Sequence, residues 1–116
     1  MKHLKEWSFG IDNDKLVSLV LQGKKTATTS LYEVDEVPEV GEESILVFSN
    51  HQKACITRTK RVLITEFQNI GEDLARLEGE GTYEEWKQAH ISYFKTVMPE
   101  FQEDTKVIFE IFEVIK

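Results

Sequence analysis

The sequence is poor in the residues that cross-link or interrupt a chain. Its 116 residues include one cysteine, two prolines and six glycines. A single cysteine excludes an intramolecular disulfide and any zinc site built from several cysteines. With 41% hydrophobic and 30% charged residues, the composition is that of an ordinary globular protein. We therefore expect residues 1–116 to form a single domain large enough to bury its own core.

Long hydrophobic runs are also missing. The longest, such as residues 44–48, are far shorter than the roughly 20 residues that cross a bilayer. Residues 1–10 contain no continuous apolar segment of the kind that directs secretion. These absences predict a cytoplasmic protein with no membrane partner. The lone Cys55 lies between Ala54 and Ile56 in a strand-like run, where cysteine usually acts as a small buried hydrophobic residue.

Positive charge is scarce as well. Lysine and arginine together number 14 against 21 acidic residues, so the formal net charge is -7. Such a protein repels phosphate backbones at long range. Extended RNA binding would need a local basic patch, for which Arg58 and Lys60, together with Lys24 and Lys25, are the candidates. The alternative interpretation of Arg58 and Lys60 is a solvated strand face.

Hydrophobic periodicity predicts helices and strands in α+β order. Leu16, Leu19 and Val20 share one face of a helix expected over residues 12–22, which Gly23 would end. Strand-like runs follow at 44–48, 54–60 and 62–67, and further helices are expected at 72–78 and 82–98. Thr82 opens a capping-box pattern at the start of the last helix.

The closing segment, residues 106–116, is rich in β-branched and aromatic residues and predicts a final strand. Its apolar residues occupy both faces, which is typical of a strand inside a sheet. The order of the elements predicts an α+β fold with a mainly antiparallel sheet, either curved or closed into a small barrel, with helices at one end.

The stretch GKKTATTS, residues 23–30, contains a lysine and a threonine that could act together. Lys25 and Thr28 converge only if the chain bends after Gly23, because i and i+3 of an extended strand face opposite ways. A lysine can deprotonate a threonine hydroxyl and make it a nucleophile. The competing interpretation is a helix C-terminus whose lysines complement the macrodipole, followed by a threonine-rich strand.

Glu78 and Glu80 form a second candidate group, between Gly79 and Gly81. Two carboxylates on such a loop can accept protons, orient an amide or hold a hard cation, or they can simply be solvated between two helices. His90 lies on an apolar helix face, where a hydrogen-bonded core histidine is the commoner role. No histidine or cysteine pair has metal-ligand spacing, so no metal site is expected.

Five blocks in order resemble the bacterial ASCH domain family. They are WSFG (7–10), GKKTATTSLY (23–32), VGEESILVF (40–48), EGEGTYEEWKQAH (78–90) and FEIFEVI (109–115). The resemblance implies a PUA-like small β-barrel with peripheral helices and a cleft between the helix-to-strand turn and the helical insertion. Some relatives are amidohydrolases that deacetylate modified cytidine, and their catalytic lysine, threonine and glutamate would fall on Lys25, Thr28 and Glu78, with Glu80 as the alternative carboxylate.

Three functions follow from this resemblance. The first is hydrolysis of an acylated nucleoside such as acetylcytidine: Thr28 attacks, Lys25 takes and returns the proton, and Glu78 positions the exocyclic nitrogen. The second is binding of single-stranded RNA, with Tyr32 or Trp7 stacking on bases, and the third is metal-stimulated RNA cleavage. The acidic charge balance favours the first, with a nucleoside-like small molecule and not single-stranded RNA as the partner. No cofactor is expected. The expected substrate-binding residues are Gly23, Lys24, Thr26, Ser30, Glu80 and His90.

Overall fold

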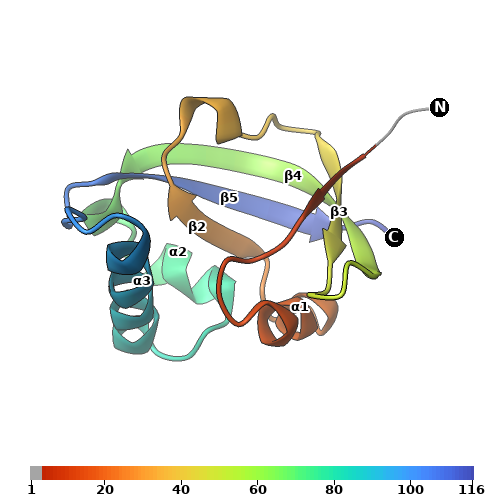
Figure 1. Cartoon of the computed structure of the whole chain (residues 1–116), viewed down its shortest axis with the longest axis horizontal. Coiled ribbons are helices and arrows are strands. Elements are labelled where there is room, and N and C mark those ends of the chain that lie inside the picture. Colours follow the sequence, from red (N-terminus) through yellow and green to blue (C-terminus); the bar gives the residue numbers. More distant parts are fainter. Residues whose placement is uncertain (1–3) are drawn as a thin grey trace.

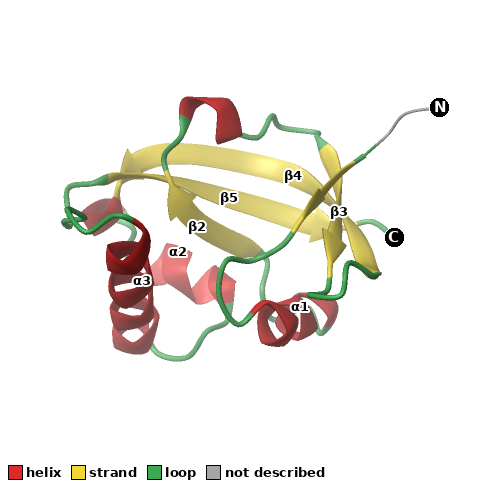
Figure 2. Ribbon diagram, viewed as in Figure 1, coloured by secondary structure: helices red, strands yellow, loops and turns green. Residues whose placement is uncertain are grey.

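The computed structural model describes residues 4–116 as a curved sheet with helices packed against it (Figures 1 and 2). No helix within these residues is long and apolar enough to cross a membrane. The regular elements are β1 (Lys5–Trp7), α1 (Asn13–Leu21), β2 (Ala27–Leu31), β3 (Glu43–Val47), β4 (Lys53–Glu66), α2 (Glu72–Ala75), α3 (Tyr83–Val97) and β5 (Lys106–Val114), with short 3₁₀ turns η1 (Val34–Glu36), η2 (Phe67–Asn69) and η3 (Arg76–Glu78).

The five strands lie in the order β1-β3-β4-β5-β2. This confirms the α+β class, but β1 and β2 are the two edges of the sheet and do not pair, so the expected closed barrel is not confirmed. Three of the four strand pairs are antiparallel, as expected, whereas β1 runs parallel to β3. The sheet is therefore mixed, and it is open between β1 and β2.

The two long strands form the middle of the sheet. Residues 54–60 and 62–67 were expected as separate strands, but all of them except Phe67, which begins η2, belong to one 14-residue strand, β4. The pairing of β4 with β5 shifts register between Thr59 and Arg61. The polar residues that separated the two expected strands therefore mark an irregularity within one strand. The prediction of an interior closing strand is confirmed, since β5 pairs with β4 on one side and β2 on the other.

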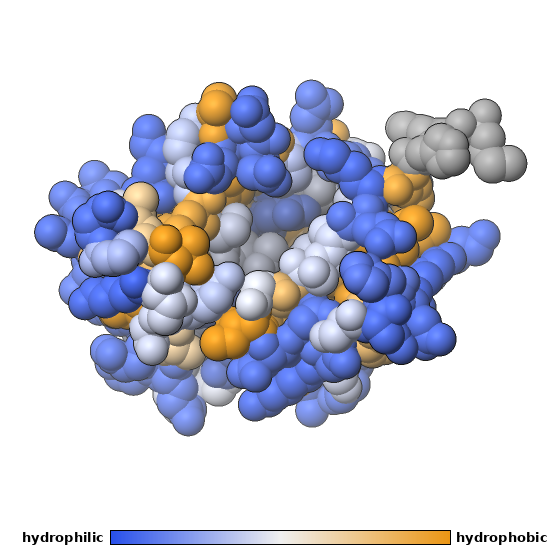
Figure 3. Space-filling view, in the orientation of Figure 1, coloured by the Kyte–Doolittle hydropathy of each residue, from blue (hydrophilic) through white to orange (hydrophobic). Residues whose placement is uncertain are grey.

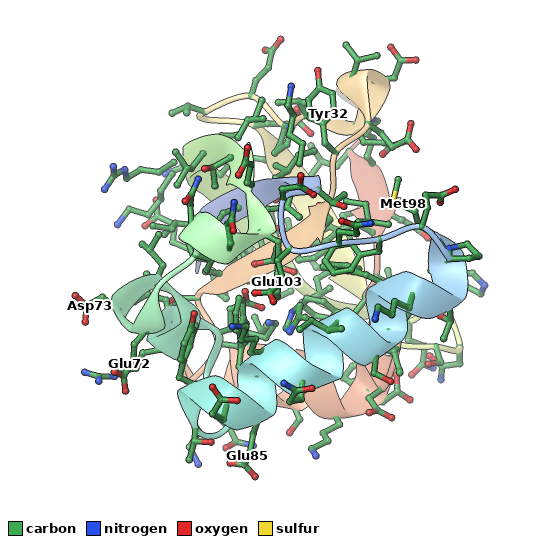
Figure 4. All side chains as sticks on the ribbon, turned by 90° about the vertical axis from the view of Figure 1, so that its left-hand side faces the viewer. Tyr32, Glu72, Asp73, Glu85, Met98 and Glu103 are labelled. Carbon is green, nitrogen blue, oxygen red and sulfur yellow. The ribbon has the colours of Figure 1, made fainter. Side chains whose placement is uncertain are left out.

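The sheet has a hydrophobic cluster on each face, because successive side chains of β5 point to opposite sides. Phe109 packs with Phe67 and Trp86 under α2 and α3, and Phe112 packs with residues of α1 and with Cys55 on the other face. Cys55 is buried, as its flanking residues indicated. Figure 4 looks onto α3, with Glu85 near its start and Met98 just after its end.

Local signals placed the helices correctly. Thr82 and Glu85 form both hydrogen bonds of the predicted capping box at the start of α3. After α1, Gly23 adopts a left-handed φ of 77° and turns the chain toward β2. The turn is tied to η3 by the amide of Thr26, which donates to the carbonyl of Leu77 at 2.8 Å.

Gly79 allows η3 and its following loop to approach this turn. Its φ is 66°, and a Cβ at this position would lie 2.2 Å from the carbonyl oxygen of Lys24. Backbone atoms cannot yield as a flexible side chain can, so any larger residue would push the loop away from the turn. The close contact places Glu78 and Glu80 beside Lys25.

We predict that Gly79→Ala destabilises the protein more than Gly41→Ala does. Gly41 also has a positive φ, of 93°, but a Cβ there would meet nothing within 4 Å. The control should lose about 1–2 kcal/mol from backbone strain alone, whereas Gly79→Ala should lose about 2–5 kcal/mol because overlap is added. Urea unfolding measures both. Equal losses would show that the contact with the Lys24 carbonyl does not constrain the loop.

Candidate functional site

A cavity of about 680 Å³ opens between the two unpaired edges of the sheet. Residues of β1 and β2 line its sides, residues of β4 and β5 contribute Thr59, Ile108 and Glu110, and α3 contributes His90. Figure 3 shows the hollow on the face that carries β1, α1 and α3. The cavity thus occupies the place where a closed barrel would have joined β1 to β2.

A buried lysine lies in the wall of this cavity. The Nζ of Lys25 is 2.9 Å from Oε1 of Glu78 and 2.5 Å from Oε2 of Glu80. Lys25 is 1% exposed and Glu78 is fully buried, while Glu80 keeps 17% of its side chain accessible. The ring of Phe9 lies 5.2 Å from the same nitrogen, within range of a cation-π contact. Lys25 therefore contacts both Glu78 and Glu80, the two carboxylates that the resemblance left as alternatives.

Both oxygens of Glu78 are occupied. Oε1 faces Lys25 and lies 3.5 Å from Nε2 of His90, and Oε2 accepts a hydrogen bond of 2.6 Å from the Thr29 hydroxyl. Burial alone would raise the pKa of Glu78, but the charge of Lys25 and the contacts from His90 and Thr29 outweigh it and lower the pKa to about 2. Glu78 is therefore ionised, and its fully buried oxygens already face Lys25, His90 and Thr29.

Glu80 differs from Glu78 in its protonation chemistry. Burial and the charge of Glu78 raise the pKa of Glu80 above its ordinary value, although Lys25 opposes the shift. The pKa of His90 is also raised: burial disfavours its charged form, but the hydrogen bond and charge of Glu78 prevail. Nδ1 of His90 lies 2.8 Å from the Trp86 carbonyl oxygen, which leaves Nε2 directed at Glu78. Of the two glutamates, Glu80 is thus the one better suited to take up a proton.

The two neighbouring threonines of β2 have different surroundings. Thr28 and Thr29 both line the cavity, but only Thr29 contacts Glu78. Among the hydrogen bonds of residues 4–116, none joins the hydroxyl of Thr28 to Lys25 or to either glutamate. The bend at Gly23 does bring Lys25 and Thr28 to one cavity, as the hypothesis for this stretch required. Any contact between them would have to form through a ligand or a small movement.

The other expected binding residues divide into two groups. Ser30, Glu80 and His90 line the cavity. Gly23, Lys24 and Thr26 do not: Gly23 and Lys24 are exposed at the helix end, and the Thr26 hydroxyl donates to the Leu77 carbonyl at 3.2 Å. These three residues shape the turn that carries Lys25.

The candidate basic patch does not exist as expected. Lys25 is buried against two carboxylates, and Arg58 lies between Glu43, at 3.4 Å, and Glu113, at 3.7 Å. Lys60 lines a second pocket, to which Gly23, Lys25 and Thr26 also contribute. Of the two basic residues of β4, Arg58 thus faces carboxylates across the sheet.

One group in the cavity could bind a cation. Ligand atoms of Glu78, Glu80 and His90 lie within 4.8 Å of one another. The ammonium of Lys25, however, already contacts both carboxylates. A divalent ion would have to displace it, which would leave a buried lysine without its partners.

Sequence reasoning missed two residues of the site. Thr29 differs from the predicted Thr28 by one position, and only the fold decides which of the two side chains meets Glu78. Glu110 lies in the closing strand and lines the cavity, where it accepts a hydrogen bond of 2.7 Å from Thr59. The one feature of the sequence that could have indicated Glu110 is an acidic residue between apolar neighbours in a strand predicted to be interior.

The comparisons with known proteins agree on one family. Residues 5–116 match the sequence model of the ASCH domain. A crystal structure of an ASCH domain from Lactobacillus crispatus is 27% identical with a TM-score of 0.86, covering 96% of this chain and 79% of that one. A protein from Enterococcus faecalis assigned to family DUF984 is 29% identical with a TM-score of 0.86, covering 99% and 82%.

A third structure, of the hypothetical protein PH0355, is 14% identical with a TM-score of 0.66 over 97% of this chain and 100% of that one, and shares the fold alone. No curated protein matches the sequence significantly.

We predict that Lys25→Met destabilises the protein by about 3–5 kcal/mol at pH 7, the usual loss when one partner of a buried ion pair is removed. The lowered pKa of Glu78 means that its pairing stabilises the wild type above pH 4.5 and that this contribution is lost as the pH falls toward 2. Without Lys25, burial should raise the pKa of Glu78. The free energy of unfolding of the variant should therefore approach that of the wild type as the pH falls.

The matched control is Lys25→Met combined with Glu78→Gln, which removes both charges and should recover most of the loss at pH 7. Urea unfolding between pH 2 and pH 8 measures all three proteins and covers the range in which Glu78 titrates. A stability difference that does not change with pH, or no recovery in the double variant, would contradict the assignment.

Proposed function

Because this chain belongs to the ASCH domain family, we propose that it hydrolyses the acyl amide of an acylated nucleoside such as acetylcytidine. The observation that supports this proposal is the Lys25 ion pair with Glu78 and Glu80 in the wall of a cavity that Thr28 also lines. A buried, coupled set of proton-carrying groups beside a hydroxyl is the arrangement that acyl transfer requires.

In the proposed mechanism, a proton moves from Lys25 to Glu80, which is the more basic of its two carboxylate partners because its pKa is raised and that of Glu78 is lowered. Neutral Lys25 then takes the hydroxyl proton as Thr28 attacks the acyl carbonyl. The tetrahedral intermediate collapses when the proton returns to the amide nitrogen, which releases cytidine and leaves the acyl group as an ester of Thr28. Water hydrolyses the ester to acetate, and the same residues handle its proton.

Glu78 has a different role in this scheme from the one inferred by resemblance. It was expected to position the exocyclic nitrogen, but Lys25, His90 and Thr29 occupy its oxygens. Its fixed negative charge instead holds Lys25 in place, and Thr29 and His90 hold Glu78. Glu78 is therefore a positioning residue for the lysine.

The charge of the cavity favours an uncharged ligand over RNA. The acidic residues that line it outnumber the two lysines, Lys5 and Lys25; they are Glu6, Asp35, Glu36, Glu42, Glu78, Glu80 and Glu110. Low-dielectric walls of one charge sign focus the field and repel ligands of the same sign. A nucleoside meets no such repulsion, whereas a nucleotide or an RNA strand does.

We predict that Thr28→Val lowers kcat for acetylcytidine by at least about 10³-fold, since the nucleophile is lost. Thr65→Val, the same change on β4 outside the cavity, should stay within about threefold of the wild type. Release of cytidine and acetate from purified protein measures both. Wild-type protein that is inactive on a panel of acylated nucleosides would refute the proposal, and loss of activity in Thr29→Val but not in Thr28→Val would move the nucleophile to Thr29.

We also predict that the 5′-monophosphate of acetylcytidine is a poorer substrate than the nucleoside, with kcat/KM reduced by about tenfold or more at low salt. Added salt should narrow the difference, because it screens the acidic wall. Equal rates on the two substrates would contradict the charge argument. Tight binding of a single-stranded RNA that weakens steeply with salt would favour the RNA-binding alternative.

A further inference from the structure

Glu110 is a cavity carboxyl from an interior strand of the sheet, and the proposed mechanism does not use it. It lies in β5 directly opposite Thr28 of β2, so the two side chains project from the same face of the sheet. The Thr59 hydroxyl donates to its Oε2 at 2.7 Å. No other hydrogen bond or ion pair to Glu110 occurs within residues 4–116, and Oε1 is therefore free to meet a ligand in the cavity.

No cation of the described chain neutralises Glu110. Burial and the nearby charge of Glu42 raise its pKa, and the hydrogen bond from Thr59 opposes the shift. The titratable groups that share the cavity with it come from β1, the β2–β3 connection, the α1–β2 turn, the η3–α3 loop and α3; they are Lys5, Glu6, Lys25, Asp35, Glu36, Glu42, Glu78, Glu80, His90 and Tyr93. A partly buried carboxylate with no paired cation is stabilised further by a proton or by a second donor group beside that of Thr59.

We propose that Glu110 binds the nitrogen side of the scissile amide, with its Oε1 accepting a hydrogen bond from the amide N–H of the ligand. In an acylated cytidine this donor is the exocyclic N–H. The inference rests on the proposed function and gives Glu110 the role that the resemblance assigns to Glu78, whose buried oxygens already face Lys25, His90 and Thr29. It identifies the ligand class as molecules with an N–H donor next to the bond that is cleaved.

The register between β2 and β5 supports this orientation. Residues directly opposite on antiparallel strands have Cβ atoms about 4.5–5.5 Å apart. The carbonyl carbon and the N–H hydrogen of an amide are about 2 Å apart, so one amide can reach Thr28 and Glu110 at once. Glu110 then holds the nitrogen while the carbonyl carbon lies near the Thr28 hydroxyl, with Lys25 on the neighbouring wall.

The test measures binding, which does not depend on whether the amide is cleaved. The probes are cytidine, which carries the exocyclic amino group, and the riboside of 2-pyrimidinone, which lacks it. The wild type should bind cytidine about 10–100-fold more tightly than the second probe, as expected for a hydrogen bond to a charged group. Glu110→Leu should bind both probes with similar, weak affinity.

Glu110→Gln provides the conservative comparison. Its amide can donate to Thr59 and present its oxygen to the ligand, so cytidine affinity should stay within about fivefold of the wild type. In the wild type, protonation of Glu110 replaces the charged acceptor with a neutral carboxyl. Cytidine binding should therefore weaken, to about the level of the glutamine variant, as the pH falls through the raised pKa of Glu110. The glutamine variant should lack that part of the pH dependence, since only the titration of the ligand and of other groups remains.

Glu113→Leu is the control for loss of an acid from β5, because Glu113 contacts Arg58 away from the cavity. It should leave the affinity ratio of the two probes unchanged. The inference is wrong if the wild type binds neither cytidine nor acetylcytidine, if Glu110→Leu keeps the preference for cytidine, or if Glu110→Gln shows the wild-type pH dependence. If Glu110 controls cytidine binding but no acylated nucleoside is cleaved, the binding role holds and the proposed hydrolysis fails.

Discussion

The ion pair of Lys25 with Glu78 and Glu80 is the interaction on which the other features of the site depend. Burying an ammonium in a protein interior is unfavourable unless carboxylates and hydrogen bonds surround it closely. The protein meets this requirement with two carboxylates from one loop, which Gly79 allows to approach the Lys24 carbonyl. The turn after α1, the η3 loop and α3 are thus constrained together, although they are far apart in the sequence.

Because the sheet is open, this ion pair lies in the wall of a cavity. Because β1 and β2 are both edges and do not pair, a cavity lies between them that a closed barrel would have filled. Its wall is predominantly acidic and carries carboxyls in different states: Glu78 is held ionised, whereas the pKa values of Glu80 and Glu110 are raised. Groups with divergent pKa values in one cavity can divide the tasks of holding, binding and proton transfer.

Much of the secondary structure was predictable because its signals are local. The capping box at Thr82 and the apolar spacing in α1 involve neighbours in sequence, and both predictions were confirmed. The parallel pairing of β1 with β3 was not predictable, since a three-residue strand carries almost no pattern and its partner lies far along the chain. The continuity of β4 was missed because a register shift resembles a turn in the sequence.

The sequence by itself determined the family, the α+β class and the residue types of the site. The order of the motifs and the periodicity of hydrophobic residues are properties of the chain that do not depend on knowing its fold. Only the tertiary structure decided what these side chains do. It showed that Lys25 is buried between two glutamates, that Thr29 and not Thr28 meets Glu78, and that Glu110 faces the same cavity. The reason is physical: burial and pKa depend on groups brought together across about 50 or more residues, and no local pattern encodes those contacts.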